Sequence, residues 1–249
     1  MNCKSAILIQ ARIGSSRLRS KVLHKINDLS ILEIGFKRLK KSKKVNQIIH
    51  LIPNTLENEI LKKEIESFGG LVFLGSEKDL IERHLGCAEA NKIDHIIRVT
   101  SDCPLVDPAE IDKFLDIYER LNDDNLYLSN FTPPEFSNYC NGSDIEIFSR
   151  KMLKKVNKLF KSEKDKEHVT FQFWDGRFKC NHYRVGWQGK FPINKVRLTI
   201  DYKEDIQVIN FLSKEINLIE ASLEEICIAY NKKNLIKYNG NFDSKAGWK

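Results

Sequence analysis

Four cationic side chains stand close together near the start of the sequence. The stretch "QARIGSSRLRSK" holds Arg12, Arg17, Arg19 and Lys21 directly after the apolar run "AILI". These charges repel one another unless an anion lies among them, and a polyphosphate is the obvious candidate. Arginine offers forked contacts to phosphate oxygens, and lysine offers a compact charge.

The small residues of this loop also suit a phosphate. Gly14 permits close approach of the backbone, while Ser15 and Ser16 offer hydroxyls and N–H groups. The pattern is neither G-x-x-x-x-G-K-[ST] nor G-x-G-x-x-G, which excludes a P-loop and a Rossmann dinucleotide fingerprint here. The alternative is a solvated basic turn, as we expect for "KRLKKSKK" at 37–44, but the position after the first strand favours function.

Two carboxylates follow two other apolar runs. Asp102 comes after "IIRVTS" and Asp201 after "RLTI", where a parallel sheet would present both at one edge. Two such carboxylates can share a hard divalent cation, and magnesium completes its shell with water and phosphate oxygens. We therefore expect Asp102 and Asp201 to be metal ligands, although each alone would more often be a cap or turn residue. Asp107 and Asp205 are expected to be caps and loop orienters.

A second group of polar residues could serve a substrate. Asp144 and Glu146 alternate along "DIEIF", so both point to one face of a strand. That face either grips sugar hydroxyls or holds cationic side chains, and a solvated edge strand is the alternative. Glu167 and His168 stand at an expected helix start, where they could contact substrate. A lone histidine is more often a packing or capping residue.

These residues need a scaffold that brings strand ends together. Short β-branched runs predict strands at 5–10, 47–52, 71–74, 95–99, 126–129, 144–148 and 196–200. Amphipathic segments predict helices at 31–41, 56–67, 77–91, 109–121, 150–160, 164–174, 204–215 and 222–232. Asp107-Pro108 and Asp165 are expected helix starts. The alternation predicts an α/β fold with a mostly parallel central sheet and helices on both faces.

One domain is expected to cover residues 1–249. The stretch 131–195 interrupts the strand–helix alternation with "TPPEF", "NG" and "WQGK", and we interpret it as an insertion or lid. Its aromatic residues either stack on a base or, more commonly, form core or a dimer interface. They are Trp174, Phe178, Tyr183 and Trp187.

Composition restricts the class of protein further. Lys and Arg number 41 against 34 Asp and Glu, a net charge of +7 that suits an anionic partner. The six cysteines are scattered without a C-x-x-C pair, which argues against structural zinc or a disulfide framework. No apolar run is long enough to span a bilayer and no signal-peptide pattern is present, so we expect a cytoplasmic protein without a membrane partner.

"ILIQARIGSSRLRSKVL" resembles the opening "IIQARxGSxRLPxKVL" of nucleotidyltransferases related to spore coat polysaccharide biosynthesis protein F. It is also similar to cytidylyltransferases that activate 3-deoxy-manno-octulosonate and acylneuraminate. Further stretches resemble motifs of the family and follow one another in the family's order. In chain order they are "GSEKDLIER", "TSDCPLVDP", "NGSDIEIFS", "KEHVT" and "IDYKED". Arg19, Asn141 and Lys166 depart from its usual proline, aspartate and arginine.

The resemblance implies a Rossmann-like nucleotide-diphospho-sugar transferase fold and a magnesium-dependent reaction of CTP with an acidic sugar, giving CMP-sugar and pyrophosphate for surface polysaccharide or glycan biosynthesis. It implies a homodimer without a nucleic-acid partner. Catalysis is assigned to Arg12, Lys21 and Asp102. Nucleotide binding is assigned to Ala11, Arg12, Gly14, Ser15, Ser16, Arg17, Lys21, Ser76 and Asp102. Substrate binding is assigned to Asp144, Glu146, Glu167 and His168, and metal binding to Asp102 and Asp201.

Some assignments keep an alternative. Ser76 is nominated because a loop there helps to hold the base in such enzymes, with Arg83 as a further candidate. Ser76 is equally a helix N-cap with Asp79 as its capping-box partner. A glycosyltransferase using a nucleotide sugar would require a D-x-D, and the sequence has only "DIE" at 144–146. A nucleic-acid-binding protein is supported only by net charge and the run 37–44.

Overall fold

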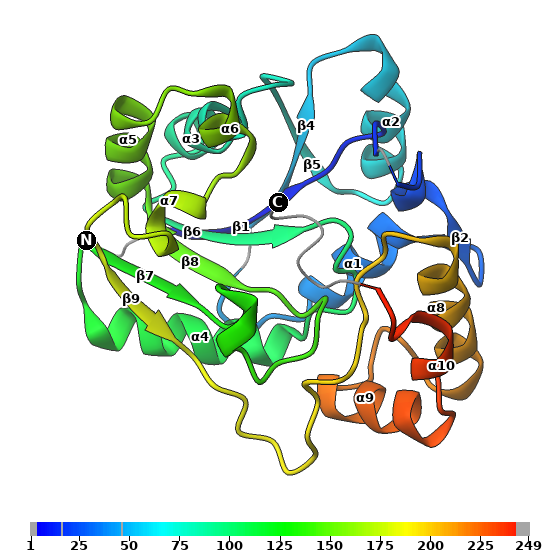
Figure 1. Ribbon diagram of the computed structural model, residues 1–249. Coiled ribbons are helices and arrows are strands. Elements are labelled where there is room, and N and C mark those ends of the chain that lie inside the picture. Colours follow the sequence, from blue (N-terminus) through cyan, green and yellow to red (C-terminus); the bar gives the residue numbers. More distant parts are fainter. Residues whose placement is uncertain (1–3, 16, 46, 243–249) are drawn as a thin grey trace.

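A seven-stranded mixed sheet forms the centre of the molecule, for which the computed structural model describes residues 4–15, 17–45 and 47–242 (Figure 1). Four neighbouring strands are parallel, β8 runs antiparallel to its neighbours, and β7 and β9 are parallel to each other. The mostly parallel sheet is therefore confirmed. Its spatial order is β5 (Leu71–Gly75), β4 (Ile48–Pro53), β1 (Ser5–Gln10), β6 (His95–Thr100), β8 (Glu146–Ser149), β7 (Leu126–Ser129) and β9 (Asn181–Arg184).

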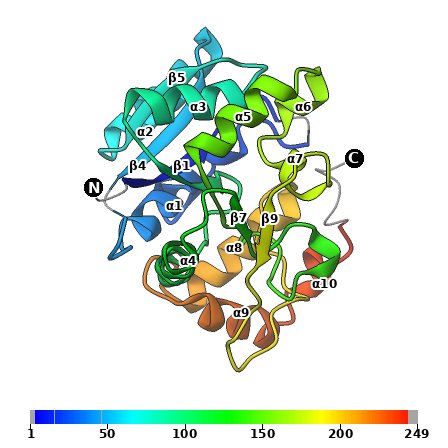
Figure 2. The same ribbon diagram turned by 90° about the vertical axis from the view of Figure 1, so that its left-hand side faces the viewer.

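Helices cover both faces of this sheet, as Figure 2 shows with α3 and α5 above the strands and α4 and α9 below. The described helices are α1 (Ile31–Leu39), α2 (Glu59–Ser67), α3 (Leu80–Ala90), α4 (Pro108–Leu121), α5 (Arg150–Leu159), α6 (Glu163–Glu167), α7 (Phe171–Trp174), α8 (Lys203–Glu215), α9 (Leu223–Lys232) and α10 (Ile236–Asn239). A small hairpin, β2 (Lys25–Ile26) and β3 (Leu29–Ser30), precedes α1. No helix in the described part of the chain is long and apolar enough to cross a membrane.

The alternation of side chains along β1 explains the two cores. Ile7 and Ile9 point to the face covered by α1, α4, α8 and α9, while Ala6 and Leu8 point to the face covered by α3 and α5. All four side chains are buried. Burial of each large aliphatic chain contributes about 1.5–3 kcal/mol, so a strand apolar on both faces belongs at the centre of a covered sheet.

Several expected boundaries need correction. The helix expected over 164–174 is two short helices, α6 and α7, and its first turn is capped by Ser162, whose Oγ accepts the N–H of Asp165. The buried segment 196–200 is extended but is not a sheet strand, because its one bridge, Asn141 to Arg197, is isolated. Asp107 caps α4 as expected by accepting the N–H of Ala109.

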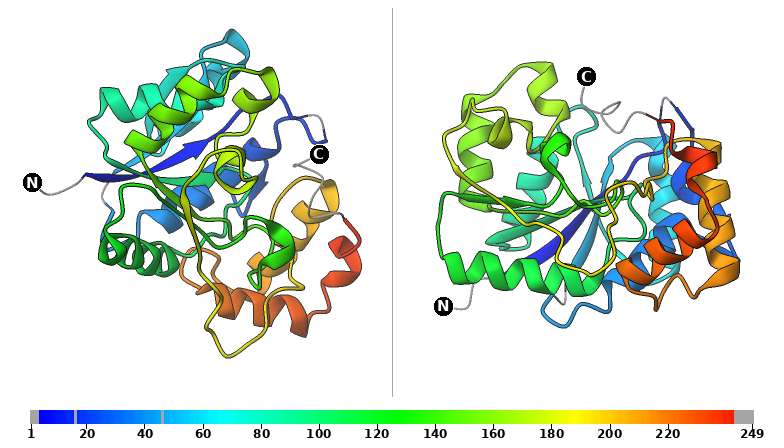
Figure 3. Two further views of the ribbon diagram at one scale, coloured as in Figure 1. Left: turned by 60° about the vertical axis from the view of Figure 1, so that its left-hand side comes forward. Right: turned by 60° about the horizontal axis from the view of Figure 1, so that its bottom comes forward.

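The segment 131–195 supplies β8 and β9 to the central sheet. β8 lies between β6 and β7 and is fully buried, so the alternative of a solvated edge strand around Glu146 is wrong. After β9 the chain forms a long loop that leads from the sheet edge towards α8 (Figure 3). That this segment acts as an insertion or lid stays a prediction.

Candidate active site

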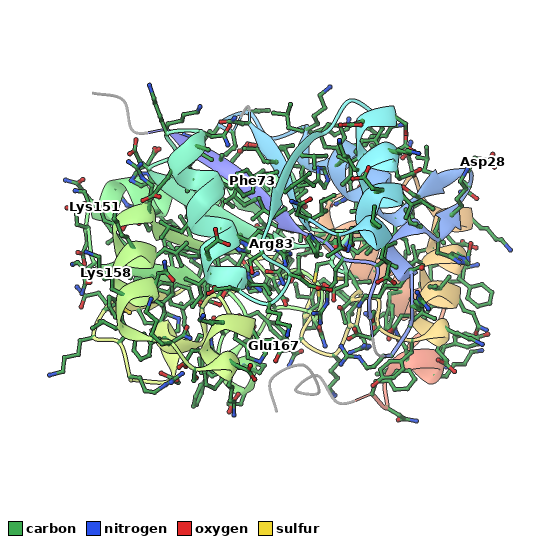
Figure 4. The ribbon with its side chains drawn as sticks, turned by 90° about the horizontal axis from the view of Figure 1, so that it is seen from above. Asp28, Phe73, Arg83, Lys151, Lys158 and Glu167 are labelled. Carbon is green, nitrogen blue, oxygen red and sulfur yellow. The ribbon has the colours of Figure 1, made fainter. Side chains whose placement is uncertain are left out.

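A polar cavity of about 390 Å³ opens where β1 and β6 end. Its lining includes Gln10 and Thr100, the last residues of those two strands, together with side chains from the loops that follow. Figure 4 shows Arg83 and Glu167 towards the middle of the molecule, whereas Lys151 and Lys158 lie on α5 at its side. The carboxyl edge of the sheet is therefore where the charged groups of the sequence motifs gather, as expected for an open α/β sheet.

The phosphate loop contributes cations to the lining of the cavity. Arg12, Ser15, Arg17 and Lys21 line it, as does the buried Ala11. Lys21 begins a 3-10 helix, Lys21–Leu23, and the preceding Ser20 has a left-handed backbone with φ of 55°. Ser16 lies outside the described residues. The loop thus presents three of its four predicted cations to the cavity.

Lys21 joins the two predicted metal ligands. Its Nζ lies 3.0 Å from Oδ2 of Asp102 and 2.8 Å from Oδ1 of Asp201, while Arg17 Nη2 lies 2.6 Å from the same oxygen of Asp201. Burial opposes charge on each group, but their mutual attraction prevails. The pKa of Lys21 is raised, and the pKa values of Asp102 and Asp201 are lowered. All three groups therefore carry charge at neutral pH.

A second set of contacts fixes Asp201. Asp205, at the start of α8, accepts the N–H groups of Asp201 and Tyr202, each at 2.9 Å. Arg197 donates to both oxygens of Asp205 and reaches Asp201 at 3.4 Å. The expectation that Asp205 orients the loop is borne out by these bonds. Because Asp205 is buried and paired on both oxygens, it holds the backbone of Asp201 in place.

Backbone hydrogen bonds bring Asp102 and Asp201 together without a continuous ladder. The carbonyl of Asp102 accepts the N–H of Ile200 at 2.8 Å, next to Asp201. On the other side, Leu198 donates its N–H to Asn141 at 2.7 Å. The extended segment 196–200 is therefore held between the turn after β6 and the turn before β8. These bonds bring Asp102 and Asp201 close together, as the sequence predicted from the ends of two strands.

The residues at this end fit a divalent cation that is shared with phosphates. In residues 4–15, 17–45 and 47–242, no cluster of three or more His, Cys, Asp or Glu side chains is arranged to hold a metal ion. Asp102 and Asp201 nevertheless converge on one ammonium, and magnesium commonly takes only one or two protein carboxylates. Their hard, ionised oxygens match that ligand preference.

Asp144 and Glu146 both line the cavity but differ in their partners. Glu146 accepts hydrogen bonds from Arg98 and from the hydroxyl of Tyr127. Asp144 Oδ1 is buried and has no hydrogen-bond partner among the described residues. Burial, with the charges of Glu146 and Asp102, raises the pKa of Asp144 to about 7. Glu146 therefore holds a cation in place, whereas Asp144 has an oxygen available to a ligand.

The remaining predicted substrate residues stand at the end of α6, where Glu167 is the last helical residue and His168 the C-cap, so the expected helix start at this position is wrong. Glu167 and His168 line the cavity with Val169, as do Leu80 of α3 and Arg12 of the loop. Burial lowers the pKa of His168. The charge of Glu167 raises this pKa, and the charges of Arg98 and Lys164 lower it further. His168 is therefore neutral at physiological pH, a form that both donates and accepts hydrogen bonds.

Other predicted residues lie away from the cavity lining. Gly14 and Ser76 do not line it, and Ser76 Oγ accepts the N–H of Asp79, which itself caps α3. The carbonyl of Ser76 accepts Nε of Arg83 at 2.7 Å, so Ser76 holds a residue that does line the cavity. Two of the three departures from the family pattern lie outside the cavity lining: Arg19 pairs with Glu57, and Lys166 pairs with Asp79. The third, Asn141, is part of the lining. None of the four nominated aromatic residues is in it.

Arg98 and Arg197 are the main site residues that the motifs did not nominate. Each interrupts an apolar run, "IIRV" and "VRLTI", shortly before a site aspartate. Both side chains are buried and paired with carboxylates, Glu146 and Asp205 respectively. An arginine inside an otherwise apolar run is the signal that would have found them, because it must have a buried anionic partner.

The basic run 37–44 has acidic neighbours instead of a free face. Lys37 pairs with Glu33, Lys41 with Glu220 and Lys44 with Asp116. The hydroxyl of Ser42 donates to Asp112. The five lysines of the run are exposed, as expected for the solvated end of a surface helix, but the interpretation is wrong for Arg38, which is buried.

The sequence and the fold both resemble known nucleotidyltransferases. The sequence model of the family described as cytidylyltransferase matches residues 6–233. The spore coat polysaccharide biosynthesis protein SpsF of Bacillus subtilis is 30% identical over 82% of this chain and 84% of its own length.

Two solved structures share the fold. A cytidylyltransferase from Leptospira borgpetersenii superposes with a TM-score of 0.89 and 29% identity, over 97% of this chain and all of that one (100%). A CMP:2-keto-3-deoxy-manno-octonic acid synthetase complexed with CTP gives a TM-score of 0.61 at 15% identity, covering 86% of this chain and 100% of the other. The likeness confirms the expected nucleotide-diphospho-sugar transferase-like fold.

Proposed function

Because the chain belongs to the cytidylyltransferase family, we propose that it transfers the cytidylyl group of CTP to an acidic sugar, giving CMP-sugar and pyrophosphate. The polar groups that line the cavity support this reaction. Cations lie beside the ionised pair Asp102 and Asp201, and Asp144, Glu167 and His168 lie in the same cavity. The cavity is thus equipped for a triphosphate and for a hydroxylated acceptor.

The cations bind and orient the triphosphate in this proposal. Arg12, Arg17 and Lys21 contact phosphate oxygens, and Arg17 adds a planar, forked geometry. A hydroxyl oxygen of the acceptor forms a bond to the α-phosphorus and gives up its proton to water, while the bond to the bridging oxygen of pyrophosphate breaks and pyrophosphate leaves. Negative charge grows on the leaving group, and the cations stabilise it electrostatically. No side-chain nucleophile is required.

Asp102 and Asp201 would hold Mg²⁺ together with the triphosphate. When bound, the ion would neutralise phosphate charge and polarise the centre under attack. The protein's own part is to keep both carboxylates ionised, which Lys21 and Arg17 do by lowering their pKa values against burial. The Asp205 hydrogen bonds keep Asp201 at a fixed orientation.

The acceptor end carries the groups for a sugar. Asp144 Oδ1 accepts a sugar hydroxyl in this proposal, since it is buried without a partner of its own. Glu167 and neutral His168 add hydrogen bonds from the end of α6. Glu146 contributes by fixing Arg98, whose guanidinium lines the cavity and provides positive charge for an acidic acceptor.

The observation that carries the proposal is the ammonium of Lys21 between the two carboxylates at the end of the phosphate loop. The test is pyrophosphate release by purified protein with Mg²⁺, each of the four ribonucleoside triphosphates and a panel of acidic sugars. We expect release that requires CTP and one acceptor. Asp102→Asn should lower the rate by roughly a thousandfold, the scale on which charge stabilisation acts.

A matched control is Asp116→Asn, which removes a carboxylate that pairs with Lys44 on the surface and should leave the rate unchanged. Release that persists in Asp102→Asn would refute the metal assignment. If no triphosphate supports release while CMP-sugars are turned over, a glycosyltransferase activity replaces the proposal.

The assembly belongs to the same proposal. We propose a cytoplasmic homodimer that associates through the 131–195 segment, which ends the sheet with β9 and exposes 45% of Tyr183. An edge strand offers unpaired backbone groups to a second copy. Light scattering after size exclusion should give twice the chain mass, and Tyr183→Lys should shift it towards the monomer. A monomer at all concentrations would refute this part.

A further inference from the structure

Residues that follow the part of the chain matched by the family model contact the candidate active site. The match ends at residue 233, yet Asn239 at the end of α10 and Phe242 contact the residues around Asp201. Figure 3 shows α10, in red, beside α8, in gold, whose first turn carries Asp205. This C-terminal segment, 239–242, is therefore part of the environment of the site even though it lies outside the family pattern.

Asn239 is the first of the two contacts. It is buried, and its Nδ2 donates to the carbonyl of Arg197 at 3.1 Å and to Oδ1 of Asp205 at 2.9 Å. Its own Oδ1 accepts the hydroxyl of Tyr230 at 2.7 Å. Asn239 thus completes the hydrogen bonding of the Arg197–Asp205 pair that holds Asp201.

Phe242 is the second contact. Its ring stacks on Tyr202 with centroids 4.1 Å apart and planes 15° apart. The guanidinium of Arg197 lies 5.6 Å from the Phe242 centroid, and that of Arg17 lies 6.0 Å from the Tyr202 centroid. Phe242 thus stacks on Tyr202, and the guanidinium groups of Arg17 and Arg197 lie 6.0 Å and 5.8 Å from the Tyr202 centroid. These contacts connect the C-terminal segment to the phosphate loop.

We propose that the C-terminal segment 239–242 positions Arg17 and Asp201 for the nucleotide. This inference rests on the proposed function for its effect on CTP. Neither Asn239 nor Phe242 lines the cavity, so both act through other residues. Phe242 holds Tyr202, the Tyr202 ring supports Arg17, and Arg17 in turn pairs with Asp201 at 2.6 Å. A pre-positioned Arg17 binds the triphosphate without first losing its side-chain freedom.

The first test needs no ligand. Phe242→Ala should increase hydrogen–deuterium exchange in residues 12–21 and 197–205, because the stack that orders Tyr202 and Arg17 is lost. Phe242→Trp should restore protection, since a larger ring can stack in the same place. The matched control is Phe211→Ala, which removes the other stacked pair of this region, Phe211 on Tyr238; neither of these rings lines the cavity.

The second test is kinetic. For Phe242→Ala we expect KM for CTP to rise about fivefold, the effect of losing one aromatic–cation support, with a smaller change in kcat. Phe242→Trp should recover the wild-type KM, and Phe211→Ala should keep it. A merely destabilising change would lower the thermal midpoint without separating KM from kcat.

The outcomes distinguish this inference from the proposed function. Unchanged exchange in 12–21 and 197–205 for Phe242→Ala overturns the inference, whatever the enzyme does. Increased exchange with no change in KM also overturns it, because Arg17 is then positioned by other groups. If the wild type releases no pyrophosphate while exchange rises as expected, the positioning role is kept and the cytidylyl transfer to an acidic sugar is abandoned.

Discussion

Lys21 sets the charge balance of the site. Its ammonium is buried against two carboxylates and is the cation that compensates both. Removing one member of a buried ion cluster leaves the others uncompensated, which costs more than the attraction that is lost. We assign the same two carboxylates to magnesium. The ammonium of Lys21 and the metal ion therefore both compensate the charge of Asp102 and Asp201.

Lys21→Met tests this sharing. In EDTA the free energy of unfolding should fall by about 2 kcal/mol, because Asp102 and Asp201 then repel each other while partly buried. Added Mg²⁺ should return much of that loss in the variant, measured by thermal unfolding. Lys44→Met, which breaks the exposed pair with Asp116, should change stability little and show no special response to Mg²⁺. Equal Mg²⁺ responses in both variants would contradict a shared site.

Asp144 predicts a pH dependence of stability. Burial raises its pKa to about 7, above the value of an unfolded chain, so the folded state binds the extra proton. Its stabilising contribution is complete below about pH 4 and is lost as the pH rises through 7. Asp144→Asn should therefore be more stable than the wild type at pH 8, by on the order of 2 kcal/mol, and not at pH 4.

This comparison uses urea unfolding at both pH values with EDTA present. Asp116→Asn is a suitable control because its carboxylate pairs with Lys44 at the surface. A difference between wild type and Asp144→Asn that is the same at pH 4 and pH 8 would show that folding does not raise the pKa of Asp144.

At the scale of elements, the turn before β8 fixes the segment that carries Asp201. Gly142 has a φ of +97°, and a Cβ there would lie 2.2 Å from the backbone nitrogen of Thr199. The close approach allows the backbone of Asn141 to bond with Val196 and Leu198. A glycine is therefore required by both conformation and space.

Gly142→Ala should lower the free energy of unfolding by about 3 kcal/mol and reduce pyrophosphate release, since segment 196–200 must move away. The control is Gly176→Ala, which has a φ of +86° but no atom within 4 Å of the added Cβ. It should cost about 1 kcal/mol through backbone strain alone. Equal losses in the two variants, measured by urea unfolding, would contradict the role of the close contact.

At the scale of the whole molecule, a buried arginine joins distant parts of the chain. Arg38 in α1 donates to the carbonyls of Val106, Leu218 and Ala221. Burial lowers its pKa to about 10, so it keeps its charge at neutral pH. One side chain thus connects the first helix, the turn before α4 and the link between α8 and α9.

Arg38→Met should lower the free energy of unfolding by about 3 kcal/mol, because three buried carbonyls lose their donor. Lys41→Met removes only the exposed pair with Glu220 and should change it by less than about 0.5 kcal/mol. Denaturant unfolding measures both. A loss for Arg38→Met no larger than that of Lys41→Met would show that the carbonyls find other partners.

The sequence by itself determined the central strands, most helices and the position of the phosphate loop. Ile7 and Ile9 alternate with Ala6 and Leu8 in a run apolar on both faces, and such a run has one stable place, inside a covered sheet. The cap at Asp107 and the motifs around Asp102 were likewise local signals. The cytoplasmic location stays a prediction.

Tertiary structure alone decided which charges compensate one another. Lys21 meets Asp201 across 180 positions of sequence, and the partner of Arg98 is Glu146 on another strand. Segment 196–200 has the composition of a strand, but its neighbours at Asn141 and Asp102 leave it without a ladder. β9 was missed because its exposed polar residues carry no periodic signal and it is held by pairing with β7. Long-range pairing depends on neighbours that local periodicity does not encode.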